Sequence, residues 1–194
     1  VKTLKFYILW VIYTLGLISG LMIIGHASPI AQEQIGLSPN IAAISVSIIA
    51  VANTTGRILW GNISDRLGRY NSIVLMFGIS ALMLVILNIS TSTIPFLISA
   101  SGIALSFGGF LGIMPSITAD KFGSRNLGIN YGVLFTAFGV AAVIGPRIAA
   151  IAKETNNGIY STAYFVSIGL NILGIICTLY MMRITNKERS LMAE

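Results

Sequence analysis

Residues 40–89 read NIAAISVSIIAVANTTGRILWGNISDRLGRYNSIVLMFGISALMLVILNI, two long apolar stretches on either side of a short charged segment, 61–69. A helix that crosses about 30 Å of hydrocarbon needs roughly 20 apolar residues. The stretches 40–61 and 71–89 approach that length, and Arg57 is the only charged residue within them. This pattern predicts two membrane-spanning helices joined by a tight connection at one membrane surface.

The rest of the chain repeats this alternation of long uncharged runs and short charged segments. The run 70–119 is too long for one helix, and we divide it at its polar turn, residues 88–95. Six spans are predicted, near 6–28, 40–61, 71–89, 95–117, 127–150 and 160–182. Only 9% of the residues are charged, whereas a soluble domain carries about 25%. We therefore expect an all-α, polytopic membrane protein, a six-transmembrane-helix bundle that contacts the lipid bilayer.

The cations are distributed unequally between the two sides of such a bundle. One side carries Lys2, Lys5, Arg66, Arg69, Lys121, Arg125, Arg183, Lys187 and Arg189. The opposite side carries Lys153. The positive-inside rule predicts that both termini are cytoplasmic, in a cell membrane such as a bacterial inner or plasma membrane. Because the cations are scattered over short membrane-edge segments, they explain the net charge of +6 without a nucleic-acid partner.

The sequence lacks the patterns expected of an enzyme. It has no phosphate-binding glycine loop, nucleophile–base constellation or cluster of metal ligands, so we expect no catalysis, no cofactor and no metal. Cys177 is the only cysteine, which excludes an intrachain disulfide. The first apolar stretch is too long for a signal peptide, whose apolar region has roughly 7–15 residues. Because the chain begins at Val1 and not Met, we expect it to be part of a longer protein.

Small residues gather in the fourth and fifth spans. The pairs Gly108/Gly112 and Gly128/Gly132 have the four-residue spacing that lets two helix backbones approach closely. Static packing and helix sliding would both use such faces, and both interpretations stay open. Pro146 lies inside the fifth span and removes a helical hydrogen bond, so a kink is expected there.

The charged segment 61–69, Gly-Asn-Ile-Ser-Asp-Arg-Leu-Gly-Arg, fits the pattern G-x-x-x-D-R-x-G-R. It resembles the signature loop of the major facilitator superfamily, whereas an ordinary basic turn would need no aspartate. We expect Gly61 to let the helix end against a close neighbour and Gly68 to permit a tight turn. Arg66 and Arg69 would hold the loop at the anionic cytoplasmic surface. The resemblance implies that Asp65 caps a helix of a second half, as a conformational latch.

Three further stretches are similar to the C-terminal half of the oxalate/formate antiporter family. They are GLMIIGHASPIA (20–31), NTTGRILWG (53–61) and ADKFG (119–123), the last followed by GINYG (128–132). The resemblance implies twelve helices, of which residues 1–194 supply the seventh to the twelfth. It also implies alternating access around a midplane site, exchange of small organic anions and a missing N-terminal six-helix half as partner.

Arg57 is the leading candidate for a substrate-binding residue. An arginine at the centre of a bilayer costs about 2.5–3.5 kcal/mol on insertion scales, so such a residue usually has a function. Its guanidinium would bind a carboxylate through two hydrogen bonds. The alternative is that the long side chain reaches the cytoplasmic headgroups. Asn53 and Asn130 would bond across helices or line the cavity beside it.

Phe138 bears on the choice of anion. Members that exchange oxalate, a dianion, carry a lysine in the fifth span, and Phe138 appears in the matching place of Phe-Thr-Ala-Phe-Gly (135–139). One cation favours a monocarboxylate such as formate, lactate or pyruvate over oxalate. His26, the only histidine, would suit proton coupling, although a packed helix-end histidine is the alternative. Arg147 is an outer-interface anchor or an entry cation.

These features predict a secondary active transporter of small organic anions, most simply an antiporter. A non-transporting membrane sensor or assembly subunit that retains the transporter fold is the second hypothesis.

Overall fold

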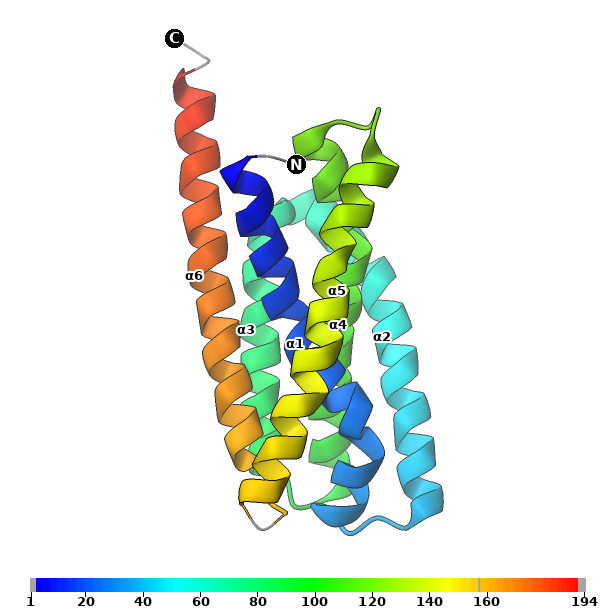
Figure 1. The fold of residues 1–194 in the computed structure, drawn as a ribbon. Coiled ribbons are helices and arrows are strands. Elements are labelled where there is room, and N and C mark those ends of the chain that lie inside the picture. Colours follow the sequence, from blue (N-terminus) through cyan, green and yellow to red (C-terminus); the bar gives the residue numbers. More distant parts are fainter. Residues whose placement is uncertain (1–2, 157, 192–194) are drawn as a thin grey trace.

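The computed structural model describes residues 3–156 and 158–191. This part of the chain folds into six helices (Figure 1), α1 (Leu4–Glu33), α2 (Pro39–Leu67), α3 (Arg69–Asn88), α4 (Thr93–Phe122), α5 (Leu127–Thr155) and α6 (Ser161–Leu191). All six are long and apolar enough to cross a membrane. The predicted all-α bundle is therefore confirmed. Lys2 and the side chain of Arg189, two of the cations counted for orientation, lie outside the described residues.

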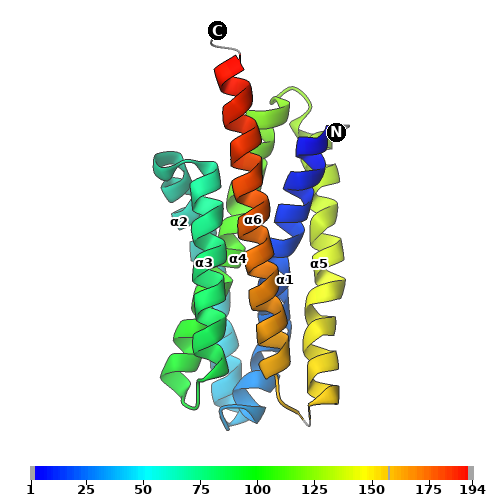
Figure 2. The ribbon, with the colours of Figure 1, turned by 90° about the vertical axis from the view of Figure 1, so that its left-hand side faces the viewer.

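The helices are arranged around a central pair. α1 and α4 contact each other, and their most apolar windows are 67% and 61% buried. α2 packs along α4 and α5 packs along α1 (Figure 1). α3 and α6 pack together on another side of the bundle, which faces the viewer in Figure 2. Only 22% and 17% of the apolar windows of α2 and α5 are buried, so both helices keep large apolar surfaces uncovered within this chain.

Two glycines of α4 allow α2 to approach closely. A Cβ added at Gly112 would come within 2.7 Å of the carbonyl oxygen of Arg57, and one added at Gly108 would overlap the carbonyl oxygen of Asn53. A larger residue at either position would push the helices apart. The close approach predicted for Gly108/Gly112 is present, and it fixes the position of α2 at the depth of Arg57.

The second glycine pair, in α5, has no such neighbour. Gly128 and Gly132 are exposed, and an added Cβ would meet nothing within 4 Å in the described chain. The predicted close helix approach at this pair is therefore not met by a described helix. Farther along α5, Gly145 does permit one, because an added Cβ would come 2.7 Å from the carbonyl oxygen of Ile18 in α1. Pro146 follows inside the same helix.

A buried amide connects the central helix α1 to α3 and α6. Asn171 of α6 is fully buried, and its Nδ2 donates to the hydroxyls of Ser19 in α1 at 3.1 Å and Ser80 in α3 at 3.4 Å. Polar groups far from water gain most from bonding across helices. These bonds hold α6 in register with its two neighbours.

At the end of the bundle opposite the termini, polar contacts join α1 to α5 and α6. Lys153 Nζ lies 2.6 Å from Glu33 Oε1, and the hydroxyl of Tyr160 donates to Glu33 Oε2 at 3.0 Å. The hydroxyl of Tyr164 donates to Oε1 of Gln34 at 2.8 Å. Burial, together with the hydrogen bond to Glu33, raises the pKa of Tyr160. The contacts tie together three helices at the end of the bundle opposite the termini.

Candidate functional site

Arg57 lies at the same depth in the bundle as residues of two other helices. It is ten residues from the end of α2 at Leu67, or about 15 Å at 1.5 Å per residue. Phe138 is eleven residues after the start of α5 at Leu127, which is roughly 17 Å from the same end. Tyr13 is nine residues into α1, or about 14 Å. Arg57, Tyr13 and Phe138 therefore form one layer.

The side chain of Arg57 is exposed in this chain, although the backbone beside it is packed against Gly112. Among the described residues it has no ion pair or hydrogen bond. The guanidinium therefore retains its hydrogen-bonding capacity.

Aromatic rings from α1, α4 and α5 surround this layer. The rings of Phe135 and Phe138 are stacked, with centroids 5.2 Å apart and planes at 14°. Phe107 of α4 contacts Phe138 at 6.4 Å, and Tyr131 contacts Phe135 at 5.6 Å. The hydroxyls of Tyr13 and Tyr131 lie 3.4 Å apart. We call these five residues the aromatic cluster.

The remaining predicted substrate-binding residues occupy different places. Phe138 belongs to the aromatic cluster. Asn53 is one turn from Arg57, but its Oδ1 is buried against Gly108 with no hydrogen-bond partner among the described residues. Asn130 is only three residues into α5, roughly 5 Å from its end, and its Nδ2 contacts the carbonyl of Phe122 at 3.5 Å. By the count of residues, Arg57 and Phe138 lie at a similar depth, whereas Asn130 is about 12 Å from Phe138 along α5.

His26 lies toward the opposite end of the bundle. Its Nδ1 is 3.3 Å from the carbonyl oxygen of Met22 in its own helix, and its ring is 6.3 Å from that of Tyr160. It is partly buried and acts electrostatically on Glu33. It is therefore close to the outer group of Glu33, Lys153 and Tyr160, and far from Arg57.

The charged segment 61–69 is mostly helical and not a loop. α2 continues through Gly61 to Leu67, so the expectation that the helix ends at Gly61 is wrong. An added Cβ at Gly61 would meet nothing within 4 Å among the described residues, so the expected close neighbour is not found in this part of the chain. The polar residues after Gly61 sustain the helix beyond the apolar stretch, because helix formation does not stop where hydrophobicity does. The turn is confined to Gly68, whose φ of 87° favours glycine as predicted.

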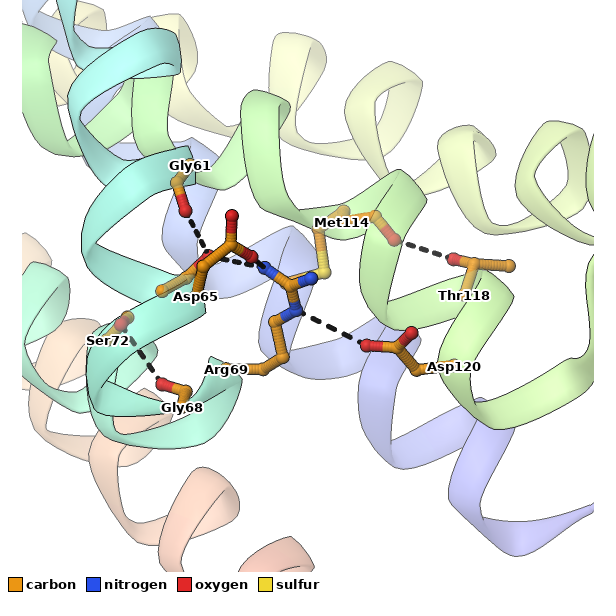
Figure 3. Close-up of polar contacts among 9 residues, drawn as sticks. Gly61, Asp65, Gly68, Arg69, Ser72, Met114, Thr118 and Asp120 are labelled. Atoms are coloured by element: carbon orange, nitrogen blue, oxygen red, sulfur yellow. Dashed lines mark hydrogen bonds and ion pairs between the residues drawn. The ribbon is translucent and has the colours of Figure 1, made fainter.

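Arg69 is the centre of a polar network at this turn (Figure 3). Its Nη1 donates to Asp65 Oδ1 and to Ser64 Oγ, both at 2.6 Å, and its Nε donates to Asp120 Oδ2 in α4 at 3.3 Å. Arg69 is 27% exposed, whereas Asp65 and Asp120 are more than half exposed. Arg66 of the motif is exposed. The network fastens the α2–α3 turn to the end of α4.

The sequence was compared with known protein families. A family model described as Major Facilitator Superfamily matches residues 9–192. The chain belongs to this superfamily. It is a multi-pass membrane protein of a transporter family, and its surroundings are lipid.

Several curated superfamily transporters are similar to this chain. The uncharacterized MFS-type transporter YhjX of Escherichia coli K12 is 33% identical over 144 residues, 72% of this chain and 35% of that protein. The oxalate:formate antiporter of Oxalobacter formigenes is 29% identical over 168 residues, 86% of this chain and 40% of that protein. Monocarboxylate transporter 12 of Xenopus laevis is 28% identical over 161 residues, 79% of this chain and 34% of that protein.

Two conclusions follow from these relatives. The likeness to the oxalate/formate antiporter family is confirmed, because the antiporter of Oxalobacter formigenes matches most of the chain. The chain spans two fifths or less of the length of each of these three superfamily relatives.

Sequence reasoning missed residues that contact or lie beside the predicted ones. Asp120 accepts a hydrogen bond from Arg69, which is 51 positions away, and its only signal was a lone acidic residue near the end of the fourth span. Ser64 lies inside the motif at a position that the pattern leaves free. Tyr13 and Tyr131 have no pattern that separates them from interface tyrosines. Their depth could be counted from the predicted helix ends, but their mutual contact could not.

Proposed function

We propose that this chain is the C-terminal six-helix half of a secondary transporter that moves small monocarboxylates, such as formate, lactate or pyruvate, by alternating access. Superfamily membership supports the transporter class. Two of the relatives are named for carriage of small carboxylates, an oxalate:formate antiporter and a monocarboxylate transporter. The uncovered apolar surfaces of α2 and α5 would contact the other half, which supplies the second wall of the cavity.

Arg57 is the observation that carries the proposal. It is a cation in the second span, and it has no acceptor among the described residues. A guanidinium in such a place can present two parallel N–H donors to a carboxylate. The low dielectric around the layer strengthens that interaction relative to water. A small organic acid is the simplest ligand that satisfies this geometry.

The aromatic cluster supports a substrate with one negative charge. Phe138 provides a ring where oxalate-exchanging relatives are expected to have a second cation, and its partners Phe135 and Phe107 are apolar. A dianion would leave one carboxylate unpaired against these rings, which is costly. Formate has no second polar group, and lactate and pyruvate have a hydroxyl or a ketone that the hydroxyls of Tyr13 or Tyr131 could meet.

The positive charge of Arg57 also favours the exchange of one anion for another. An empty site in a closed, water-poor state would leave the Arg57 cation unpaired, and a bound anion would neutralise it. Reorientation would therefore be favoured when substrate is bound, which is antiport. His26 lies away from this layer, so coupling to a proton would have to act through the outer ends of α1 and α6.

The motif end of the bundle would face the cytoplasm, as the cation bias predicts, with both described ends of the chain on that side. In this orientation the Arg69 network lies at the inner surface, and Asp65, which is 63% exposed, keeps one oxygen available to a helix of the other half. Gly128 and Gly132 at the start of α5 would offer that half a smooth face.

Counterflow in proteoliposomes tests the proposal. The intact protein is reconstituted with internal formate, and uptake of labelled formate, lactate, pyruvate and oxalate is measured in parallel. We expect uptake of the monocarboxylates to exceed that of oxalate, and efflux to be slow when no counter-substrate is outside. Rapid efflux without counter-substrate would refute exchange, and absence of uptake for all four acids would favour a non-transporting protein.

A further inference from the structure

An apolar hollow of about 250 Å³ lies between α1 and α6, two helices that contact each other and run side by side in Figure 2. It is lined by Tyr7, Ile8 and Val11 of α1 and by Cys177 and Tyr180 of α6. We call it the α1–α6 groove. Neither Arg57 nor any residue of the aromatic cluster lines it, so it is separate from the layer proposed to bind the transported anion.

The lining of the groove changes from apolar to amphipathic along the two helices. Tyr7 is three residues into α1, so it lies near the end of the bundle that carries both termini. Val11 is four residues deeper in α1, and Cys177 is three residues deeper than Tyr180 in α6, which is roughly 4–6 Å in each case. Tyr7 and Tyr180 are 60% and 54% exposed. Amphipathic rings prefer the boundary between hydrocarbon and water, so the groove passes from hydrocarbon depth to that boundary.

Arg183 of α6 places a cation just beyond the two tyrosines. It follows Tyr180 by three residues, so it is a neighbour of that residue on the helix surface, about 4.5 Å nearer the end. It is also the first residue after the predicted span 160–182. The residue is exposed and forms no ion pair or hydrogen bond within the described part of the chain. An arginine in this position can bind a phosphate through two parallel N–H donors.

These features favour a lipid of the surrounding membrane as the occupant of the groove. The chain is surrounded by lipid, and a phospholipid carries apolar acyl chains below a phosphate, which is the order of the groove and Arg183. An acyl chain gains little by leaving other acyl chains for an apolar groove, because both surroundings are equally apolar. What distinguishes a bound lipid from its neighbours is therefore the pairing of its phosphate with the arginine.

We propose that the α1–α6 groove binds one phospholipid, with an acyl chain against Val11 and Cys177 and the phosphate paired with Arg183. The lipid fills the hollow between α1 and α6 and holds the two helices at a fixed separation. It is not transported. Its binding depends on the membrane location of the chain and not on which acid is carried, so failure of the proposed transport would leave it intact.

Binding is measured with the intact protein, purified in detergent and stripped of lipid, without any transport assay. Phosphatidylglycerol and a diacylglycerol with the same acyl chains are added in parallel. Native mass spectrometry counts the lipid molecules retained, and labelling of Cys177 by N-ethylmaleimide reports whether the groove is covered. We expect phosphatidylglycerol to be retained about fivefold more than the diacylglycerol, the equivalent of one cation near an anionic headgroup, and to slow the labelling of Cys177.

Three outcomes of this measurement would overturn the proposal. Equal retention of the two lipids would show that the phosphate is not recognised, and retention of neither would show that the groove holds no lipid. A Cys177 that reacts only after the lipid-free protein is unfolded would show that another part of the protein, or a second copy, covers the groove.

Two variants test whether the lipid lies in the groove. Val11→Trp adds a large side chain at a position that is 38% exposed, so it should fill the hollow and lower retention of phosphatidylglycerol to the level of the diacylglycerol. Ile172→Trp is the matched control, at a 50% exposed position of α6 five residues before Cys177 and thus on another side of the helix, and it should retain the lipid as the parent does. Unchanged retention in Val11→Trp, or an equal loss in both variants, would contradict the site. The comparison of the two lipids uses the parent protein, so it remains decisive if Val11→Trp does not fold.

Discussion

Arg57 lies ten residues before the end of α2, and Arg69 begins α3 twelve positions later; their surroundings differ in kind. Arg69 is 27% exposed and bonds to Ser64, Asp65 and Asp120, so the chain itself satisfies its guanidinium. Arg57 is exposed and has no hydrogen bond or ion pair within the described part of the chain. A cation with partners from two other helices holds a structure together. A cation without them, placed in an apolar layer, is available to a ligand.

The difference extends to the packing around each arginine. The backbone at Arg57 is fixed because Gly112 admits α2 at close range, so the position of the unpaired guanidinium is defined even though its side chain is not bonded. Around Arg69, by contrast, the turn at Gly68 and the carboxylate of Asp120 define the side chain itself. Helix packing thus positions the backbone of the residue proposed to bind substrate, and side-chain bonding positions the guanidinium of Arg69.

The largest effect is expected at Arg57. Arg57→Gln should lower formate counterflow at least about 100-fold, the equivalent of about 2.7 kcal/mol, because the substrate loses a charge-assisted bidentate contact. Thermal stability should not fall, since no partner in the chain loses a bond. Arg57→Lys should retain part of the activity. Arg125→Gln, an exposed cation between α4 and α5, is the control and should transport normally; a parallel loss there would mean that net charge, and not this site, matters.

The second expected effect is a change of substrate preference at Phe138. Phe138→Lys adds a cation to the layer of Arg57, and the preference for oxalate over formate should rise about tenfold, roughly the value of one new charge-assisted hydrogen bond. Competition of labelled formate counterflow by unlabelled oxalate measures it. Phe138→Leu removes the stacking with Phe135 but adds no charge, so it should leave the preference unchanged. An equal shift in both variants would contradict the charge argument.

At Arg69 the expected effect is on stability. Arg69→Gln should cost about 1 kcal/mol, because Asp65 and Asp120 are more than half exposed and solvent screens both pairs. Thermal unfolding of the detergent-purified protein measures the loss. Arg66→Gln changes a neighbouring exposed arginine of the same motif and should cost less. If Arg66→Gln proved equally destabilising, the hydrogen bonds of Arg69 would not explain its role.

Apolar length predicted the six helices, but not where they end. Hydrophobicity marks the part of a helix that lies in lipid, and polar residues can extend the helix into the headgroup region. For that reason α2 passes Gly61 and stops only at Gly68, where the positive φ breaks it. The close approach at Gly112 could be predicted from spacing, whereas the missing neighbour of Gly132 could not, because spacing does not say which helix comes close.

Among the predicted substrate-binding residues, only Arg57 carries an unusual energetic cost. An arginine in a span is costly enough to be noticed in the sequence, and its role in binding stays a prediction. Asp120 bonds to Arg69 across 51 positions, and nothing local marks that pairing. Asn130 was chosen as a polar residue in an apolar run, but its place in the first turn of α5 puts it beside the carbonyl of Phe122 instead of Arg57. Which side chains pair, and which residues of different helices lie side by side, depends on tertiary packing.

A third cation, Lys153, lies at the end of the bundle opposite the termini. The smallest predicted effect on stability concerns the contacts around it. Lys153, like Arg69, forms an ion pair, and its partner is Glu33. The side chains of Lys153 and Glu33 are 40% and 42% exposed. Tyr160→Phe removes the second donor to Glu33 and should cost about 0.5 kcal/mol at neutral pH, the low end for a hydrogen bond in contact with solvent. If Tyr160→Phe lost more stability than Arg69→Gln, the contacts around Glu33 would contribute more to stability than the Arg69 network, contrary to this prediction.

The pH dependence of the stability of Tyr160→Phe tests whether the hydroxyl of Tyr160 causes the stabilisation. Because burial and the bond to Glu33 raise the pKa of Tyr160 above its ordinary value of 10.0, the stabilisation is fully present below about pH 10 and is lost as pH rises through the raised pKa. The unfolding curves of the parent and Tyr160→Phe should therefore differ at neutral pH and converge in strong alkali. In a Glu33→Gln background the alkaline change should be smaller, since a neutral amide does not oppose ionisation of the phenol. A difference that is independent of pH would show that Tyr160 acts through packing of its ring against His26, 6.3 Å away, and not through its hydroxyl.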